Sequence, residues 1–158
     1  MKNYLTKNLE EISQIVYESL KWISDNDSGV WSTTEWNICN HLSSLFRERF
    51  KDFDVDVELI KHDGRRPDIV IHGRGHNESN LVVFQVKKKP SYQDVVEDFK
   101  KITETFFGEP YNYAYGIFIS IGELPDKLPE FDKNKIHIHS VSGWKLITDE
   151  EWKEKYQL

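Results

Sequence analysis

The stretch Leu81-Val82-Val83-Phe84-Gln85-Val86-Lys87 constrains the fold of this chain more than any other part of the sequence. It is an almost continuous apolar run, interrupted only near its end by two polar residues. Runs of this kind are typical of central strands, which are buried on both faces of a sheet. The stretch therefore predicts the middle of a β-sheet, around which the remaining elements must be arranged.

The hydrophobic pattern elsewhere predicts further strands and several helices. From Leu5 to Ile23 the apolar residues recur at steps of three and four, which is the spacing of one helical face. The predicted helices span residues 5–24, 33–50 and 92–107 with a short one from 148, and the predicted strands span residues 55–60, 69–71, 81–87, 115–121 and 136–141. Three strands in a meander, followed by a helix and more strands, predict a single α/β domain, residues 1–158, with a mixed sheet.

The helix predicted at 33–50 carries an acid at its start. Ser32, Thr33 or Thr34 could cap it, which places Glu35 in the first turn. The apolar side of this helix is predicted to contain Trp36, Cys39, Leu42, Leu45 and Phe46.

Composition and charge exclude several classes of protein. The 21 Lys and Arg residues against 27 Asp and Glu residues give a net charge of −6, which excludes a nucleic-acid binder that works by bulk positive charge. The one cysteine, Cys39, cannot form a disulfide framework or a cysteine-based zinc site. No signal-like or membrane-spanning apolar segment is found, so we expect a cytoplasmic protein without a membrane partner.

Three polar side chains are predicted to meet at one edge of the sheet. If residues 69–72 pair with residues 81–84 so that Val70 faces Val83, then Asp68 lies opposite Gln85. Because strand side chains alternate, Gln85 and Lys87 share a face. A carboxylate, an amide oxygen and an ammonium group suit a divalent-cation site, with Asp68 as the main ligand and Lys87 beside a bound water. The alternative is that Gln85 and Lys87 lie at a frayed strand end and contact solvent.

The residues around this predicted site resemble a known superfamily. Arg65 to His72, followed by Leu81 to Lys88, is similar to the PD-(D/E)XK nucleases, which have the restriction-endonuclease-like fold. Pro67-Asp68 matches the PD step, and Gln85-Val86-Lys87 matches the (D/E)-x-K step with Gln in place of the usual acid. The resemblance covers roughly residues 32–121.

Further matches link the chain to a group of small bacterial members of this superfamily. Glu35 matches an acid that opens the preceding helix, Arg74-Gly75 matches a pair after the second strand, and Asp98 to Ile102 matches a D-x-x-K-L step on the next helix. The resemblance implies a three-layer restriction-endonuclease-like core, in which helices flank a central mixed sheet, with an extra N-terminal helix.

The resemblance also implies a function and a set of site residues. Members of the superfamily hydrolyse phosphodiester bonds with water activated by Mg²⁺ or Mn²⁺, and DNA is the expected substrate here. Carried over, the catalytic residues are Asp68, Gln85, Lys87 and Glu35, and the metal ligands are Asp68, Gln85 and Glu35. Gln85 is the main departure, because an amide brings no negative charge and leaves the charge of the site to Asp68 and Glu35.

A basic segment surrounds the predicted site. Between Lys61 and Lys89 there are seven Lys and Arg residues and three acids, a local charge of +4. Such a segment suits a phosphate backbone, although it could also be an ordinary solvated face. The residues predicted to contact nucleic acid are Arg65, Arg66, Arg74, Lys88, Lys89 and Lys101. A homodimer is common in the superfamily, but no residue of this chain argues for one.

Other interpretations of the sequence stay open. The chain could be a nuclease-fold module that binds nucleic acid or regulates a partner without turnover, since fold does not fix function. It could also be a protein-interaction domain, for which the acidic balance and the aromatic-rich ends are the only indications. Among weaker candidate ligands, Glu58 could reach the metal and His137 and His139 share one strand face.

Overall fold

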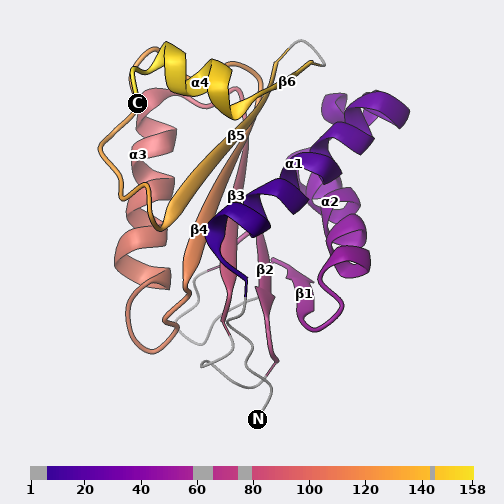
Figure 1. Ribbon diagram of the computed structural model, residues 1–158, viewed down its shortest axis with the longest axis vertical. Coiled ribbons are helices and arrows are strands. Elements are labelled where there is room, and N and C mark those ends of the chain that lie inside the picture. Colours follow the sequence, from indigo (N-terminus) through magenta and orange to yellow (C-terminus); the bar gives the residue numbers. More distant parts are fainter. Residues whose placement is uncertain (1–6, 59–65, 75–79, 143–144) are drawn as a thin grey trace.

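The computed structural model describes residues 7–58, 66–74, 80–142 and 145–158 (Figure 1). Its helices are α1 (Leu9–Asn26), η1 (Ser28–Ser32), α2 (Glu35–Arg49), α3 (Tyr92–Lys100), η3 (Lys101–Phe106) and α4 (Asp149–Lys155), and its strands are β1 (Asp54–Val57), β2 (Ile69–His72), β3 (Val82–Lys88), β4 (Tyr115–Ile121), β5 (Ile136–Ser142) and β6 (Lys145–Ile147). The first residues of the predicted 5–24 helix and the end of the predicted 55–60 strand lie outside the described residues.

The six strands form one mixed sheet in the order β1-β2-β3-β4-β5-β6. Strands β1, β2 and β3 are the predicted antiparallel meander, whereas β3, β4 and β5 run parallel and β6 is antiparallel to β5. The predicted α/β class with a mixed sheet is confirmed. Strand β6 was not predicted, because three residues are too few to show an alternating pattern.

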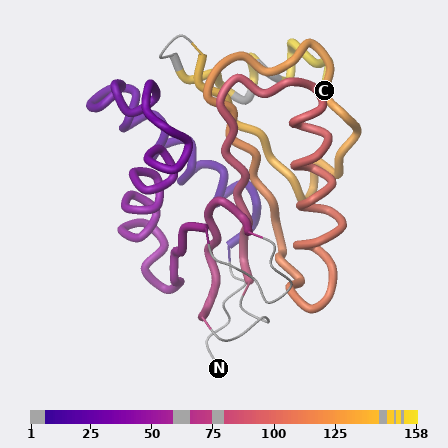
Figure 2. The backbone as a smooth tube through the Cα atoms, turned by 180° about the vertical axis from the view of Figure 1, so that it is seen from behind, coloured from indigo at the N-terminus to yellow at the C-terminus, as the bar shows by residue number. Residues whose placement is uncertain are grey.

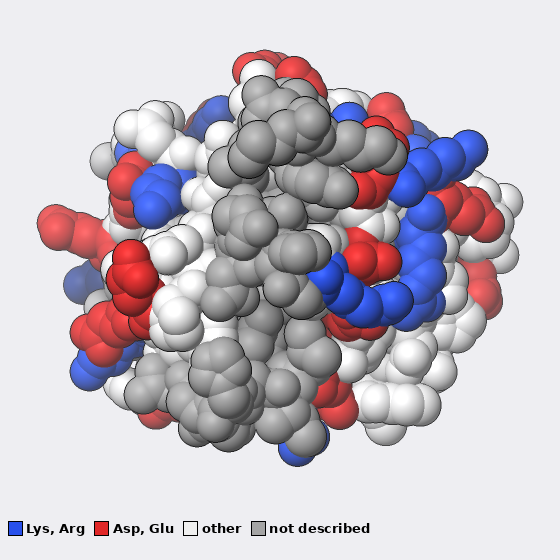
Figure 3. All heavy atoms as spheres, turned by 90° about the horizontal axis from the view of Figure 1, so that it is seen from below, with Lys and Arg blue, Asp and Glu red and all other residues white. Residues whose placement is uncertain are grey.

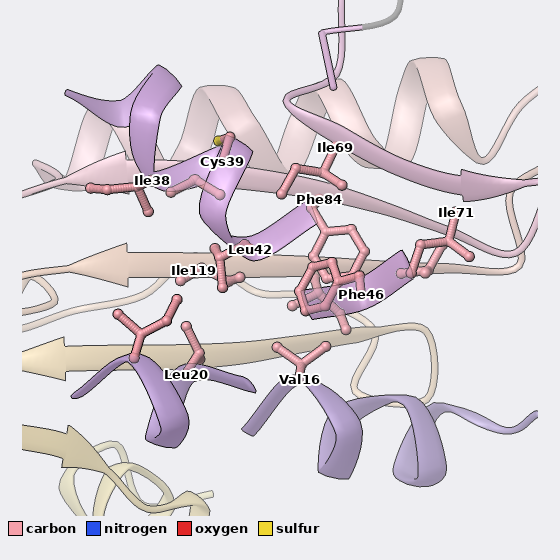
Figure 4. Close-up of a cluster of buried hydrophobic side chains, with 14 of the residues drawn as sticks. Val16, Leu20, Ile38, Cys39, Leu42, Phe46, Ile69, Ile71, Phe84 and Ile119 are labelled. Atoms are coloured by element: carbon pink, nitrogen blue, oxygen red, sulfur yellow. The ribbon is translucent and has the colours of Figure 1, made fainter. Parts of the chain in front are cut away.

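Helices cover both faces of the sheet, so the molecule has three layers. Helices α1 and α2 lie on one face and α3 lies on the other (Figures 1 and 2). Ile69, Phe84 and Ile119 point toward α1 and α2, where Phe84 stacks on Phe46 with ring centroids 5.0 Å apart (Figure 4). Because strand side chains alternate, the neighbouring residues of these strands face α3, where they form a second apolar cluster.

Helix α1 begins where Asn8 caps it, since the Asn8 side chain accepts a hydrogen bond from the Glu11 amide at 2.9 Å. Its buried apolar residues are Ile12, Val16, Leu20 and Ile23, which confirms the predicted stripe. The rest of α1 is mostly polar, although Trp22 is 47% exposed. Among the described residues, no helix combines the length and the apolar character needed to cross a membrane.

Helix α2 begins at Glu35, because the Thr34 side chain accepts a hydrogen bond from the Asn37 amide at 3.2 Å. The predicted position of Glu35 in the first turn is confirmed. The prediction for Trp36 was wrong, because this side chain is 59% exposed while Ile38 takes a buried position. At about 100° per residue, Trp36 lies roughly 120° away from Leu42 around the helix, outside the buried stripe.

The helix predicted at 92–107 consists of two segments. A capping box formed by Ser91 and Asp94 starts α3. From Lys101 the chain continues as a π-helix, in which the Phe107 amide donates to the carbonyl of Ile102 at 2.9 Å. Apolar spacing does not distinguish these two kinds of helix over a single turn, and so the change was not predicted.

The π-helical segment packs closely against β4 at Gly116. A Cβ atom at this position would lie 2.6 Å from Cγ2 of Ile102, so Gly116→Ala is expected to destabilise the protein by about 1–3 kcal/mol through overpacking. Urea unfolding measures this difference. Gly29→Ala is the control, because nothing lies within 4 Å of the added atom there. Equal stability of the two variants would contradict the close packing of η3 on β4.

Candidate functional site

The predicted strand register is confirmed at the edge where Asp68 lies. Val70 pairs with Val83, and the Asp68 amide donates to the carbonyl of Phe84 at 3.3 Å, which continues the pairing one residue beyond β2. Asp68 therefore lies opposite Gln85. Its Oδ2 atom accepts a hydrogen bond from the Val86 amide at 2.7 Å, so the carboxylate is held against β3.

Gln85 and Lys87 follow Val83 on the face of β3 that looks toward α3. Gln85 is only 2% exposed, and its Nε2 atom has no hydrogen-bond partner among the described residues. The alternative of a frayed, solvated strand end is therefore wrong for Gln85. Because the two ends of a side-chain amide exchange by a half-turn, the same position can present an oxygen acceptor.

Helix α3 adds a second carboxylate to this face, that of Asp98. The side chain is 6% exposed, and its Oδ2 atom lacks a hydrogen-bond partner among the described residues. Asp98 entered the sequence analysis only as part of a helical step and not as a site residue. The signal that could have identified it is its place within the buried stripe of Val95, Phe99 and Ile102, where an acid is out of pattern.

The charges around Asp68 show which groups share its neighbourhood. Burial raises the pKa of Asp68 to about 6, although the hydrogen bond from Val86 opposes this shift. The negative charges of Asp98 and Glu35 raise this pKa further, and the positive charge of Lys101 lowers it. Three acids from three elements therefore act on one another at this edge, and bringing a cation among them would relieve their repulsion.

The pKa of Asp98 is also raised, mainly by burial. Lys87 and Lys101 lower it, whereas Asp94 and Glu35 raise it. Lys87 from β3 and Lys101 from η3 are thus the basic groups that accompany the acids. The two lysines and the carboxylates form a mixed, partly buried cluster between β3 and α3.

We expect the burial of Asp68 to make stability depend on pH. Its pKa in the folded protein lies above the ordinary value of 3.8, so the folded state holds a proton that the unfolded state loses between about pH 4 and pH 6. Stability therefore falls as pH rises through this window and stays lower above it. Relative to the wild type, Asp68→Asn is expected to gain on the order of 1–3 kcal/mol by pH 7. Urea unfolding measured from acid to neutral pH tests this, and a difference that does not grow with pH would contradict it.

Glu35 reaches the site from the opposite side of the sheet. The start of α2 lies near the end of β3, because Lys88 Nζ donates to the carbonyl of Thr33 at 2.7 Å. Glu35 is partly buried, and its charge acts on Asp68 and Asp98. One turn later, Cys39 is buried, as predicted, and burial raises the pKa of its thiol.

The structure separates the residues predicted to contact nucleic acid. Lys101 lies in the acidic cluster, and Lys89 is exposed directly after β3. The side chain of Lys88 instead extends toward η1, where it bonds to Thr33. Arg66 approaches Glu58 at 3.7 Å, which gives both residues an ionic partner at the edge of the sheet. Arg65 lies outside the described residues.

Arg74 lies beyond the other end of β2, far along the strand from Asp68. Its guanidinium group donates two hydrogen bonds to Asp56, at 2.9 and 2.7 Å. His72 contacts the same carboxylate at 2.7 Å. The hydrogen bonds from Arg74, which have the largest effect, and from His72 lower the pKa of Asp56 to about 2. At the end of the molecule drawn in Figure 3, acidic and basic side chains likewise lie next to one another.

The oxygen donors of the site are two carboxylates and an amide. Among the described residues, no three His, Cys, Asp or Glu side chains are placed as a ready metal centre. The site nevertheless fits a hard divalent cation, because the partly buried Asp68 and the buried Asp98 repel each other and Gln85, opposite Asp68, has an unpartnered amide nitrogen among the described residues. Glu35 is a further acid whose charge acts on both carboxylates.

The histidine pair of β5 belongs to a different part of the fold. The rings of His137 and His139 lie 4.7 Å apart, on the face toward α1. His139 is buried and contacts the Ser13 hydroxyl at 3.1 Å. This contact joins β5 to α1, which is a packing role.

Large hollows on the described surface lie away from the acidic cluster. One hollow, of about 870 Å³, is lined mainly by the start of α1 and the β5 region. Another, of about 760 Å³, is lined by residues between 126 and 133 and by the C-terminal residues 155–158. Neither is lined by Asp68, Gln85 or Lys87. The candidate site instead lies between the second half of β3 and α3, near the end of the sheet at which the parallel strands β3 to β5 finish (Figure 1).

Comparison of the chain with protein-family models, with curated proteins and with solved structures gives no match.

Proposed function

We propose that this chain is a metal-dependent nuclease with a restriction-endonuclease-like core, and that it hydrolyses phosphodiester bonds in DNA. The observation that carries the proposal is the β2–β3 register, which sets Asp68 opposite Gln85, two residues before Lys87 on the same face of β3. The position of the cluster supports it too, because α/β proteins bind ligands beyond the carboxyl ends of their parallel strands.

Each residue of the cluster has a chemical role in this proposal. Asp68 and Gln85 would hold a Mg²⁺ ion, with Glu35 as a further acid at the site. When bound, the ion supplies a water of lowered pKa and a positive charge for the phosphoryl oxygens. The Lys87 ammonium would orient the attacking water by hydrogen bonding and would stabilise the negative charge that develops on the phosphate oxygens.

The charges of the site fit an anionic polymer. The chain as a whole carries −6, so its attraction for a phosphate backbone must be local. Lys87 and Lys101 act on the cluster, and Lys89 is exposed two residues after Lys87.

Cleavage of nucleic acid tests the proposal directly. The wild type is incubated with supercoiled plasmid, linear duplex, single-stranded DNA and RNA, in Mg²⁺, in Mn²⁺ or in EDTA. We expect nicking or cutting of DNA that requires the metal and disappears with EDTA. The absence of metal-dependent cleavage of every substrate would contradict the proposal, and salt-sensitive binding without cleavage would favour a binding module.

Gln85→Glu probes the residue that departs from the resemblance. A carboxylate here adds a negative charge next to Asp68, and charge count tunes metal affinity, so we expect Mn²⁺ binding at least about tenfold tighter and faster cleavage. Isothermal titration calorimetry measures the affinity. The control is Gln93→Glu on the exposed start of α3, which adds the same charge elsewhere. Equal effects of the two substitutions would argue against a metal beside Gln85.

A further inference from the structure

We infer that Asp98 is the second anionic metal ligand of this chain, and that it supplies from α3 the negative charge that Gln85 does not bring to β3. The inference rests on the proposed function, since it assigns one more residue to the same site. It concerns a carboxylate that the sequence analysis did not place among the catalytic or metal-binding residues.

The buried position of Asp98 raises the question of why an acid occupies it. Its side chain is 6% exposed and belongs to the buried stripe of α3, yet its Oδ2 atom has no hydrogen-bond partner among the described residues. The positive charges of Lys87 and Lys101 act on Asp98 without a hydrogen bond to Oδ2. A buried carboxylate in this state lowers stability, and an apolar residue would pack better. A ligand role accounts for an acid at this position.

The position of Asp98 relative to the other donors supports that role. Its charge acts on Asp68, which is fixed against β3 by the bond from Val86. Gln85, whose Nε2 atom also lacks a partner among the described residues, lies on the sheet face that α3 covers. Two unsatisfied, deeply buried polar groups therefore accompany Asp68, one from the strand and one from the helix.

Charge balance favours the same assignment. With Gln85 neutral, Asp68 alone would offer a divalent cation a single negative charge from the strands. Asp98 raises this to two on the face that α3 covers, which matches the charge of Mg²⁺ or Mn²⁺, whereas Glu35 approaches from the opposite side of the sheet. Hard cations bind most strongly where carboxylate oxygens supply that charge.

Mn²⁺ binding measured by electron paramagnetic resonance tests the inference, because the signal of free Mn²⁺ reports binding without any turnover. We expect Asp98→Asn to weaken Mn²⁺ binding at least about tenfold. The control is Glu97→Gln, which removes the same charge from the adjacent, exposed position of α3 and should leave the affinity within about twofold. Thermal unfolding without metal should show Asp98→Asn to be at least as stable as the wild type, so weaker binding would not reflect unfolding.

A compensating variant makes the test stricter. In Gln85→Glu/Asp98→Asn the acid moves from α3 to β3, and we expect Mn²⁺ affinity within about threefold of the wild type. Restoration by this pair is the result that a purely structural role of Asp98 would not produce.

The outcomes separate this inference from the proposed function. Wild-type Mn²⁺ affinity in Asp98→Asn, an equal loss in Glu97→Gln, or no Mn²⁺ binding by the wild type would overturn the inference. If the wild type cleaves DNA while Asp98→Asn binds Mn²⁺ normally, the nuclease proposal stands and Asp98 is not a ligand. If Asp98→Asn loses Mn²⁺ but the wild type cleaves nothing, Asp98 is a ligand in a protein that is not a nuclease.

Discussion

Asp68→Asn is expected to reduce metal-dependent DNA cleavage at least about 10³-fold, the largest effect of any single substitution in this chain. The Val86 amide donates a hydrogen bond to the carboxylate of Asp68 at 2.7 Å, so the backbone of β3 holds this donor in place. Asn has the same shape but no charge, and it removes the main attraction for the cation. Initial rates of plasmid nicking at saturating Mg²⁺, together with Mn²⁺ affinity, measure the loss.

A second strand carboxylate provides the control for this prediction. Asp56 on β1 is held by Arg74 and His72, away from the cluster. Asp56→Asn is expected to leave cleavage within about threefold of the wild type at a temperature where both are folded. If Asp68→Asn keeps its activity, or if Asp56→Asn loses as much, the cleavage arises from another site.

Lys87→Met is expected to lower cleavage at least about 10²-fold while metal affinity stays the same or increases. The ammonium group acts on the charge that develops during reaction, so its loss affects turnover. It also repels a bound cation, so its removal does not weaken metal binding. This separation of cleavage rate from metal affinity distinguishes Lys87 from Asp68, for which both fall together.

The neighbouring residue Lys88 is the matched control. It belongs to the same strand but its side chain lies on the opposite face, where it donates to Thr33 at 2.7 Å. Lys88→Met is expected to reduce cleavage by less than about fivefold. Similar losses in the two variants would indicate that the lysines act only through general attraction for nucleic acid.

The strand pairing could be predicted from the sequence because both partners are buried. A shift of one residue would move Val70 and Val83 to the wrong face, so the apolar pattern fixes the register. Strand β6 has three residues and shows no such pattern. Trp36 was misplaced because a residue in the first turn of a helix is easily assigned to the wrong side of a stripe.

Residues of the site that depend on packing between layers were harder to predict. Asp98 reaches the cluster only because α3 folds back over the sheet, and strand periodicity holds no information on that contact. The charge of the basic segment was counted along the chain, but Arg74 is paired with Asp56 at the far end of β2. Net charge in a sequence segment does not show which charges are already neutralised by neighbours in space.

Crystals of the protein soaked in Mn²⁺ give the most direct test of the account, through anomalous diffraction at the manganese edge. We predict a peak about 2.0–2.4 Å from oxygen atoms of Asp68 and Asp98, with the Gln85 amide turned toward it. A Mn²⁺ ion bound only elsewhere, or no peak beside Asp68 under conditions in which Mn²⁺ supports DNA cleavage, would contradict a metal centre at this edge of the sheet.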